Sequence, residues 1–487
     1  MDFYKIVETI SVHIMGWPFI ILCLSTGIYF SIRMRFFQIR CLKRMFKLLF
    51  KSKPSGSGIS SFQAFMLALS GRVGTGNIAG VATAIALGGP GAVFWMWIIA
   101  FFGAGTAYIE ATLAQVYKEK IDGVYRGGPA YYILKGLNNK YYATAFALVT
   151  IFAMGVLMPG VQANAISEAF HHSFSIDIHI TAGVVTLLLA LVIFGGIRRI
   201  AKVAEIVTPF MALGYILIAL VILVINYQHI PSMFMLIVKS AFGLQEALSG
   251  VVGYAITMGV KRGLFSNEAG QGSAPHAAAA AEVPHPANQG LVQAFSVYVD
   301  TLLVCTATAF MILISGMYRV YDVHNAMNVV MEGGSLPAAI TTYGPVNTQL
   351  AVDANIPGFG SAFVALALFF FAFTTIMSYY FQAETNIYYL YRNKARKSHL
   401  TINALRIIML VFTFYTGVKE MTFAWNMADI GLGLMAWFNL IAILLLQGIA
   451  LRTFNDYEKQ LRNGVAQPKF HPERLNIKST KEWHGDK

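Results

Sequence analysis

Long apolar runs separated by short polar segments make up most of the chain. A helix that crosses ~30 Å of hydrocarbon needs about 20 mostly apolar residues. Eleven runs meet this length, at residues 14–33, 60–88, 92–116, 142–170, 180–197, 202–226, 245–283, 290–316, 359–390, 401–418 and 421–451. The pattern predicts an all-α polytopic membrane protein with about 11 transmembrane helices.

Two of these runs, 60–88 and 245–283, are too long and too rich in glycine and polar residues to be plain helices. Residues 70–80 and 261–273 each contain an arginine, then glycines, then a polar Thr/Ser–Asn core between apolar flanks. Non-helical backbone at membrane depth persists only where it is buried in protein or lines a water-filled cavity. We therefore expect two broken helices at a functional site.

The two breaks occupy matching positions, because one opens spans two to six and the other opens spans seven to eleven. Five spans is an odd number, so the two halves must have opposite topology. Such a pair indicates the binding site of a secondary transporter, where freed N–H groups bind carboxylates and freed carbonyls bind hard cations. Close helix packing is the alternative explanation for Gly74, Gly76 and Gly80, but the matched pair favours the transporter.

This repeat predicts four parts of the chain. They are an extra N-terminal helix with a basic segment (1–59), a first five-helix repeat (60–230), a second, inverted five-helix repeat (231–451) and a cytoplasmic tail (452–487).

Composition supports a lipid environment. Of 487 residues, 56% are hydrophobic and 12% charged, against about 25% charged in a soluble domain. This excludes a soluble globule of this size and also intrinsic disorder. The net charge of +13 would suit a nucleic-acid binder, but the lysines and arginines lie mostly outside the apolar runs. The lipid bilayer is therefore the expected partner, and no nucleic acid is expected.

The basic residues also predict orientation. Residues 33–53 carry eight lysines and arginines, and strict alternation puts the basic residues of 118–140, 198–202, 392–397 and the tail on the same side. Cytoplasmic loops carry the excess of Lys and Arg, so we expect a multi-pass protein of the cell (plasma or inner) membrane with its N-terminus outside and its C-terminus cytoplasmic. Aromatic residues interleave with the basic ones over 35–50, which favours contact with anionic lipid.

Several motifs resemble the alanine or glycine:cation symporter family of sodium-coupled amino-acid carriers. The most specific are Gly88-Gly89-Pro90-Gly91-Ala92-Val93-Phe94-Trp95-Met96-Trp97 and Arg262-Gly263-Leu264-Phe265-Ser266-Asn267-Glu268-Ala269-Gly270. Tyr125-Arg126-Gly127-Gly128-Pro129 and Asp300-Thr301 with Cys305-Thr306 are also similar to that family. The resemblance covers about residues 14–450 and implies the leucine-transporter-type 5+5 inverted repeat behind one extra N-terminal helix.

Residues 73–77 separately resemble the break in the first core helix of neurotransmitter:sodium symporters. The resemblance implies that the amides of Thr75 and Gly76 hold a substrate carboxylate. It also implies that Asn77 binds an ion or the substrate, and that sodium is bound by the carbonyls of Ser70 and Val73.

The ninth span carries Thr374 and Thr375. The leucine-transporter-type fold implies that adjacent threonines here offer hydroxyl oxygens to the same sodium, with Thr375 also near the substrate. The alternative is that each hydroxyl bonds the backbone of its own helix. In the alanine carriers this stretch usually ends in Gly-Trp, whereas here it is Ser378-Tyr379. With Tyr379 lining the pocket, a polar or larger substrate side chain becomes an option.

Two further polar residues are expected at the substrate. Gln162 lies in Gln162-Ala163-Asn164, which resembles an element of the same family, and Asn267 belongs to the second break.

Charges inside the spans are costly and usually functional, so Arg72, Arg262, Glu268 and Asp300 are expected to form a gating or charge network. For Asp300 we consider a sodium-site carboxylate, a proton carrier and an ion pair with Arg72 or Arg262, and we favour the ion pair because buried cations need compensation. Glu268 is the candidate for the substrate amine or for gating. Glu110 and Glu384 are expected near inner span ends, where they cap helices or pair with basic loops.

The leading hypothesis is a secondary active transporter that moves a small neutral amino acid (alanine, glycine or a related polar one such as glutamine) with sodium by alternating access. Na+ is then the coupling ion and the only metal, with no other cofactor and no enzyme activity. One alternative is a proton-coupled carrier with Asp300 or Glu268 titrating. Others are an amino-acid sensor without flux and an intramembrane hydrolase built on Glu268 and His276, for which no convincing nucleophile–base or metal set is present.

Overall fold

The structure is a computed structural model that describes residues 3–244, 252–322, 328–391 and 395–483. The start of the predicted span 245–283 and part of the predicted basic cluster 392–397 lie outside these residues.

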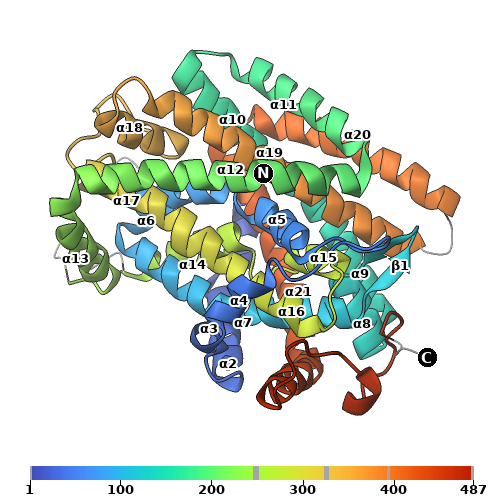
Figure 1. Cartoon of the computed structure of the whole chain (residues 1–487). Helices are drawn as coiled ribbons and strands as arrows, with labels where there is room; N and C mark the ends of the chain where they lie inside the picture. Colours follow the sequence, from blue (N-terminus) through green and yellow to red (C-terminus); the bar gives the residue numbers. More distant parts are fainter. Residues whose placement is uncertain (1–2, 245–251, 323–327, 392–394, 484–487) are drawn as a thin grey trace.

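Helices form nearly all of the regular structure (Figure 1). They are α1 (Phe3–Ile14), α2 (Trp17–Arg33), α3 (Phe37–Arg40), α4 (Leu42–Leu48), α5 (Ser61–Arg72), α6 (Val81–Gly88), α7 (Gly91–Val116), α8 (Pro129–Leu137), α9 (Lys140–Phe152), α10 (Pro159–Phe174), α11 (Ile178–Ile193), α12 (Gly196–Ile225), α13 (Ile230–Ala241), α14 (Val252–Asn267), α15 (Ala274–Ala280), α16 (Pro286–Val297), α17 (Thr306–Ser315), α18 (Pro345–Asn355), α19 (Gly360–Tyr391), α20 (Ala395–Gly417) and α21 (Met421–Arg462).

Shorter elements join or interrupt these helices. The π-helical turns are η1 (Gly76–Gly80), η2 (Ala153–Leu157) and η5 (Tyr298–Cys305), and the 3₁₀ turns are η3 (Tyr227–His229) and η6 (Pro472–Leu475). Two antiparallel hairpins pair β1 (Glu119–Ile121) with β2 (Val124–Arg126) and β3 (Arg319–Tyr321) with β4 (Val329–Glu332).

Within the described residues, eight helical stretches are long and apolar enough to cross a membrane. They are Phe3–Arg33, Gly91–Val116, Lys140–Phe174, Arg199–Ile225, Pro286–Ser315, Gly360–Tyr391, Ser398–Gly417 and Met421–Arg462. The other three predicted spans coincide with the shorter α11 and with the two interrupted helices α5–η1–α6 and α14–α15. The all-α membrane class is confirmed, while the count of 11 stays a prediction.

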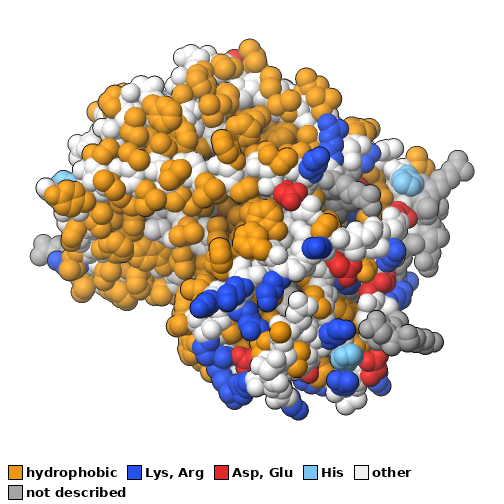
Figure 2. All heavy atoms as spheres, in the orientation of Figure 1, with side chains coloured by type: hydrophobic (Ala, Val, Ile, Leu, Met, Phe, Trp, Pro, Cys, Tyr) orange, Lys and Arg blue, Asp and Glu red, His pale blue; other side chains and the backbone are white. Residues whose placement is uncertain are grey.

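The surface divides into an apolar part and a basic end. Figure 2 shows hydrophobic side chains over α12 and α13, and Lys and Arg side chains gathered around α4 and the C-terminal segment. The apolar side chains of α12 are well exposed, with Phe210 71% and Leu213 62% accessible. Such a surface is unfavourable in water and favourable in lipid. We call the part around α4, β1 and the C-terminal segment the basic end.

The first interrupted helix has a defined start and a defined break. Ser60 and Gln63 form a capping box at the start of α5. The helix ends at Arg72 because Val73 is extended, with ψ 96°, and the side-chain Oδ1 of Asn77 then accepts the Gly74 amide at 2.8 Å. A Cβ on Gly74 would lie 2.5 Å from the Thr375 hydroxyl, so only glycine allows this close approach.

The second interruption separates α14 from α15. Glu268 adopts a left-handed backbone with φ 53°, and Gly270 and Gly272 follow at φ 87° and 85°. The predicted break at residues 261–273 is confirmed for 268–273, whereas Lys261 to Asn267 belong to α14. Arg262 therefore lies on a regular helix before the break.

Packing brings the two interruptions together in the centre of the molecule. α14 packs along α6 and η1, and α15 packs along α5. α19 and α12 also pack on α5, and α7 contacts both α14 and α15. Figure 1 shows α5, α14 and α15 surrounded by these longer helices. The breaks are thus buried in protein, as their backbone requires.

Candidate functional site

Three oxygen atoms converge where α5 ends. The Thr375 hydroxyl donates to the Ser70 carbonyl at 2.9 Å and reaches the Val73 carbonyl at 3.2 Å. Both carbonyls are free for this contact because the helix stops before residues 74 and 77 could donate to them in the α-helical pattern. Carbonyl and hydroxyl oxygens are ligands for hard cations such as Na+. The geometry therefore brings together three of the predicted sodium ligands.

Thr374 behaves differently from its neighbour. Its hydroxyl donates to the Phe371 carbonyl of its own helix at 2.9 Å, and no hydrogen bond of Thr374 to the first break is present among the described residues. Successive residues on a helix point about 100° apart, so only one of two adjacent threonines faces a given partner. The Thr375 hydroxyl also lies 3.0 Å from the Phe371 carbonyl, so the backbone-bonded alternative describes Thr374 fully and Thr375 in part. The candidate sodium position is left with Thr375, which alone of the two reaches the first break.

Gln162 closes the substrate side of the first break. Its Oε1 accepts the Thr75 amide at 2.9 Å, and its Nε2 donates to the Tyr379 hydroxyl at 3.4 Å. The Thr75 hydroxyl is fully buried and has no hydrogen-bond partner among the described residues. Gly76 touches the second interrupted helix, since a Cβ there would lie 3.0 Å from the Ser266 Cα. The predicted substrate residues are thus neighbours, and one polar atom among them is unsatisfied.

Asp300 is held by neutral donors. Its Oδ1 accepts Asn77 Nδ2 at 2.7 Å, while its Oδ2 accepts the hydroxyls of Ser266 at 2.8 Å and Thr301 at 2.7 Å. The cluster joins the first break to the second interrupted helix and places the Asp300 carboxyl group beside Asn77.

Among the described residues, the favoured ion pair of Asp300 with Arg72 or Arg262 is not formed. Arg262 pairs with Asp429 and lies 4.2 Å above the Trp425 ring. Arg72 donates to the Gln293 carbonyl at 3.1 Å and to the Ser296 hydroxyl. The reason is that each arginine finds a partner on an element that sequence spacing does not place beside it.

Glu268 faces the first break from the second. Its Oε2 accepts the Ser273 hydroxyl at 2.6 Å, whereas its buried Oε1 has no hydrogen-bond partner among the described residues. A Cβ on Gly71 would lie 3.5 Å from Oε2. Glu268 therefore offers an unpartnered carboxyl oxygen next to the predicted substrate residues.

Glu110 holds the second break through contacts that the sequence did not reveal. It was expected to cap a helix or pair with basic loops, but it is fully buried and accepts the amides of Gly270 at 3.3 Å and Gly272 at 3.2 Å and Asn439 Nδ2 at 2.7 Å. It thus fixes the shape of the second break. The only signal was a lone acid in an apolar run.

The other expectations divide between confirmed pairs and positioning contacts. Glu384 pairs with Arg126 of the basic loop at 3.6 Å, as predicted. Asn267 donates to Thr301 at 3.3 Å and accepts the Ala269 amide at 3.0 Å. It shapes the end of α14, and its predicted contact with substrate stays a prediction.

Comparison with known proteins agrees with this geometry. The profile of the sodium:alanine symporter family matches residues 1–472. The chain belongs to the sodium:alanine symporter family. The family resemblance inferred from the sequence is therefore confirmed, and the protein is a membrane transporter and not an enzyme.

Individual relatives agree with this family assignment. A sodium/proton-dependent alanine carrier protein of Bacillus sp. (strain PS3) is 49% identical over 441 residues, covering 90% of this chain and 97% of that one. YrbD of Bacillus subtilis (strain 168), described as a candidate sodium/proton-dependent alanine carrier, is 54% identical over 477 residues, 98% of this chain and 97% of its own length. The crystal structure of MhsT in complex with L-phenylalanine matches with a TM-score of 0.52 at 12% identity, over 82% of this chain and 98% of that one. This likeness shows the leucine-transporter-type fold.

In this symporter the central site is closed on both sides. On one side lie the Arg262–Asp429 pair and the rings of Phe265 and Trp425, whose centroids are 4.8 Å apart. Between the two sides, Thr75 and Asn77 are 0% exposed, and the residues of both breaks are all buried. The structure thus corresponds to an occluded arrangement.

On the other side, the basic end is closed by backbone contacts. The Ile59 amide donates to Ala280 O at 3.0 Å, and Gln115 Nε2 and Lys118 Nζ each donate to Ala281 O at 2.9 Å. Trp483 of the C-terminal segment donates to Gln115 O at 2.8 Å. Burial lowers the pKa of Lys118 to about 8, because keeping the charged ammonium in this buried position costs free energy.

His276 gives no support to a hydrolytic centre. One ring nitrogen lies 2.9 Å from Ser273 O and the other 2.8 Å from Asn386 Nδ2. Both nitrogens are therefore engaged in packing contacts, and the Glu268–His276 alternative has no hydrogen bond between its two members among the described residues.

Proposed function

We propose that the protein couples the downhill entry of Na+ to the uptake of a small neutral amino acid by alternating access. The observation that carries this proposal is the convergence of the Ser70 and Val73 carbonyls on the Thr375 hydroxyl. A half-membrane helix break with freed oxygens facing a threonine is suited to a hard cation and has no evident purpose in a plain helix bundle.

The substrate would be bound through its charged groups at opposite sides of the same space. Its carboxylate would take the Thr75 and Gly76 amides, displacing Gln162 from the Thr75 amide, with help from the unpartnered Thr75 hydroxyl. Its ammonium would meet the unpartnered Oε1 of Glu268. An unsatisfied donor and an unsatisfied acceptor in one buried site match a zwitterion.

The substrate side chain would face Tyr379, which Gln162 orients from α10. Alanine and glycine fit such a small space, and the tyrosine hydroxyl adds a polar contact for an amino acid such as glutamine. The names of the two Bacillus relatives describe alanine carriers, which agrees with a substrate that has a small side chain.

Sodium would act by favouring the state that opens away from the basic end. A ligand shifts a conformational equilibrium only by its differential affinity for the two states, and the Ser70–Val73–Thr375 oxygens exist as a set only while α19 packs against α5. With the N-terminus outside and the C-terminus cytoplasmic, opening at the basic end would release the cargo inside. The 60–230 and 231–451 repeats are the proposed moving parts.

A proton-coupled mechanism is the second candidate. It is favoured by one observation, the free and buried Oε1 of Glu268, since a carboxylate without a partner can take a proton at lower cost than one with three donors. Asp300, with its three donors, is not the group we would choose.

Uptake into proteoliposomes separates the candidates. Labelled amino acid should accumulate under an imposed sodium gradient, with the other nineteen amino acids as competitors to rank the substrates. Accumulation under a proton gradient with sodium absent would overturn sodium coupling. Binding of substrate without accumulation under either gradient would indicate a sensor instead.

A further inference from the structure

A cavity of about 470 Å³ lies at the basic end, apart from the central site. Its walls come from α4, the start of α5, the α15–α16 connection and residues 466–468 of the C-terminal segment. Its basic lining residues are Arg44, Lys47, Lys51 and Lys53, and its acidic lining residue is Glu282.

The charge of this cavity is not neutralised within the protein. Among the described residues, no ion pair involves the three lining lysines, which are exposed. Within the described part of the chain, the Arg44 guanidinium donates only to the Tyr457 hydroxyl, at 3.4 Å. The acid is already engaged, because the Ser55 hydroxyl donates to the Glu282 carboxylate at 2.6 Å.

A buried amide in the wall also lacks a partner. Asn288 is 8% exposed and lines the cavity, yet its side-chain Oδ1, a hydrogen-bond acceptor, has no partner within the described residues. Buried polar groups are normally satisfied. Together with the unpaired cations, this unpaired acceptor points to a ligand that carries both an anionic group and a hydroxyl donor.

The surroundings of the cavity indicate which kind of anionic ligand it binds. Arg44, Lys47 and Leu48 lie on the side of α4 that lines the cavity, and Lys51 follows just after the end of the helix. Neighbouring aromatic side chains are exposed, with Phe46 55% and Phe50 65% accessible. Exposed phenylalanines give a soluble anion no favourable contact. A phospholipid, in contrast, needs a polar site for its phosphate beside an apolar surface for its acyl chains.

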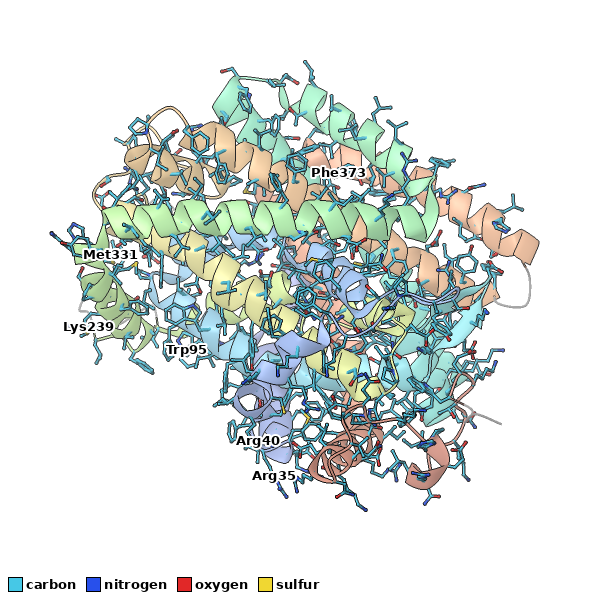
Figure 3. The ribbon with its side chains drawn as sticks, in the orientation of Figure 1. Arg35, Arg40, Trp95, Lys239, Met331 and Phe373 are labelled. Carbon is cyan, nitrogen blue, oxygen red and sulfur yellow. The ribbon has the colours of Figure 1, made fainter. Side chains whose placement is uncertain are left out.

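We propose that this cavity binds the phosphate of an anionic phospholipid from the adjoining leaflet, with the acyl chains passing along Phe46 and Phe50. Figure 2 shows Lys and Arg side chains around α4 directly beside hydrophobic ones. Figure 3 places Arg35 and Arg40 at the same end and Lys239 in a distant part of the molecule. Basic pockets of this kind suit anionic headgroups.

Such a lipid would connect the two interrupted helices. The wall includes Ser61, at the start of α5, and Val283, which follows α15. Between them the Glu282 amide donates to Ile59 O at 2.8 Å, one of the contacts that closes the basic end. A lipid bridging both sides stabilises this closed arrangement and has to loosen when the basic end opens.

The test measures lipid binding directly and does not depend on transport. Native mass spectrometry of the purified chain, titrated with phosphatidylglycerol or with phosphatidylcholine of the same acyl chains, would compare the parent protein with the double variant K47Q/K51Q. Lys43→Gln is the matched control, because Lys43 is exposed on the same helix but does not line the cavity. Thermal melting confirms that each variant is folded.

We expect a phosphatidylglycerol adduct on the parent and on K43Q that is selective over phosphatidylcholine. At about fivefold per basic residue near an anionic surface, the double variant should bind it about 25-fold more weakly. Equal binding of the two lipids, or an equal loss in K43Q, would overturn the proposal. Displacement of the lipid by millimolar inorganic phosphate would also overturn it, since the ligand would then be a free anion.

Discussion

Replacement of Thr375 by valine tests the cation site with a change that keeps the side-chain shape. Valine removes the oxygen that contacts the Ser70 carbonyl at 2.9 Å and the Val73 carbonyl at 3.2 Å. Of three converging oxygens, two would remain for the ion. A polar contact to a charged group contributes about 1.5–3 kcal/mol, and each 1.4 kcal/mol is a factor of ten. The sodium concentration for half-maximal uptake should therefore rise about 10- to 100-fold.

The chain provides its own control one residue earlier. Thr374→Val removes a hydroxyl that donates only to Phe371 O at 2.9 Å, so it should leave the sodium dependence nearly unchanged. Thr375→Ser retains the oxygen and should restore most of the sodium affinity. The assay is labelled amino-acid uptake against a series of external sodium concentrations, with thermal melting of each variant as the measure of folding. Equal sodium dependence in Thr375→Val and the parent, or an equal shift in Thr374→Val, would refute the reasoning.

Three further predictions address other parts of the molecule. Glu110→Gln removes one of the two carboxyl oxygens that accept the Gly270 and Gly272 amides and should lower the free energy of unfolding by about 2 kcal/mol together with uptake; unaltered melting and uptake would contradict this role. Tyr379→Trp should shift the substrate ranking toward alanine and glycine in competition assays, and an unchanged ranking would remove Tyr379 from the pocket. Because burial lowers the pKa of Lys118 to about 8 from 10.5, the unfolded chain binds more protons between these values and stability should rise with pH there, by up to about 3 kcal/mol. Lys118→Met should lose this rise in melting curves, and parallel curves would argue against it.

The sequence by itself determined the class of the molecule and the places where its helices break. Apolar runs of membrane-spanning length, glycines at 74, 270 and 272 and the family-like motifs are local features, and local features are readable without knowing what lies opposite. Helix α5 stops before Val73 because the following residues include two glycines and an asparagine whose side chain accepts the Gly74 amide. No long-range contact was needed to predict it.

Only the tertiary structure decided which polar groups meet. Thr374 and Thr375 are indistinguishable in sequence. Both hydroxyls bond the backbone of α19, but the rotation of α19 against α5 brings only Thr375 to the carbonyls of the first break. In the same way, Asp300 accepts a hydrogen bond from Asn77, and Glu110 accepts one from the Gly270 amide of the second break. These partners are separated by 160 residues or more. Hydrophobic periodicity fixes which residues leave water, but helix rotation and crossing fix which buried donor faces which acceptor, and that information resides in the packing of the whole chain.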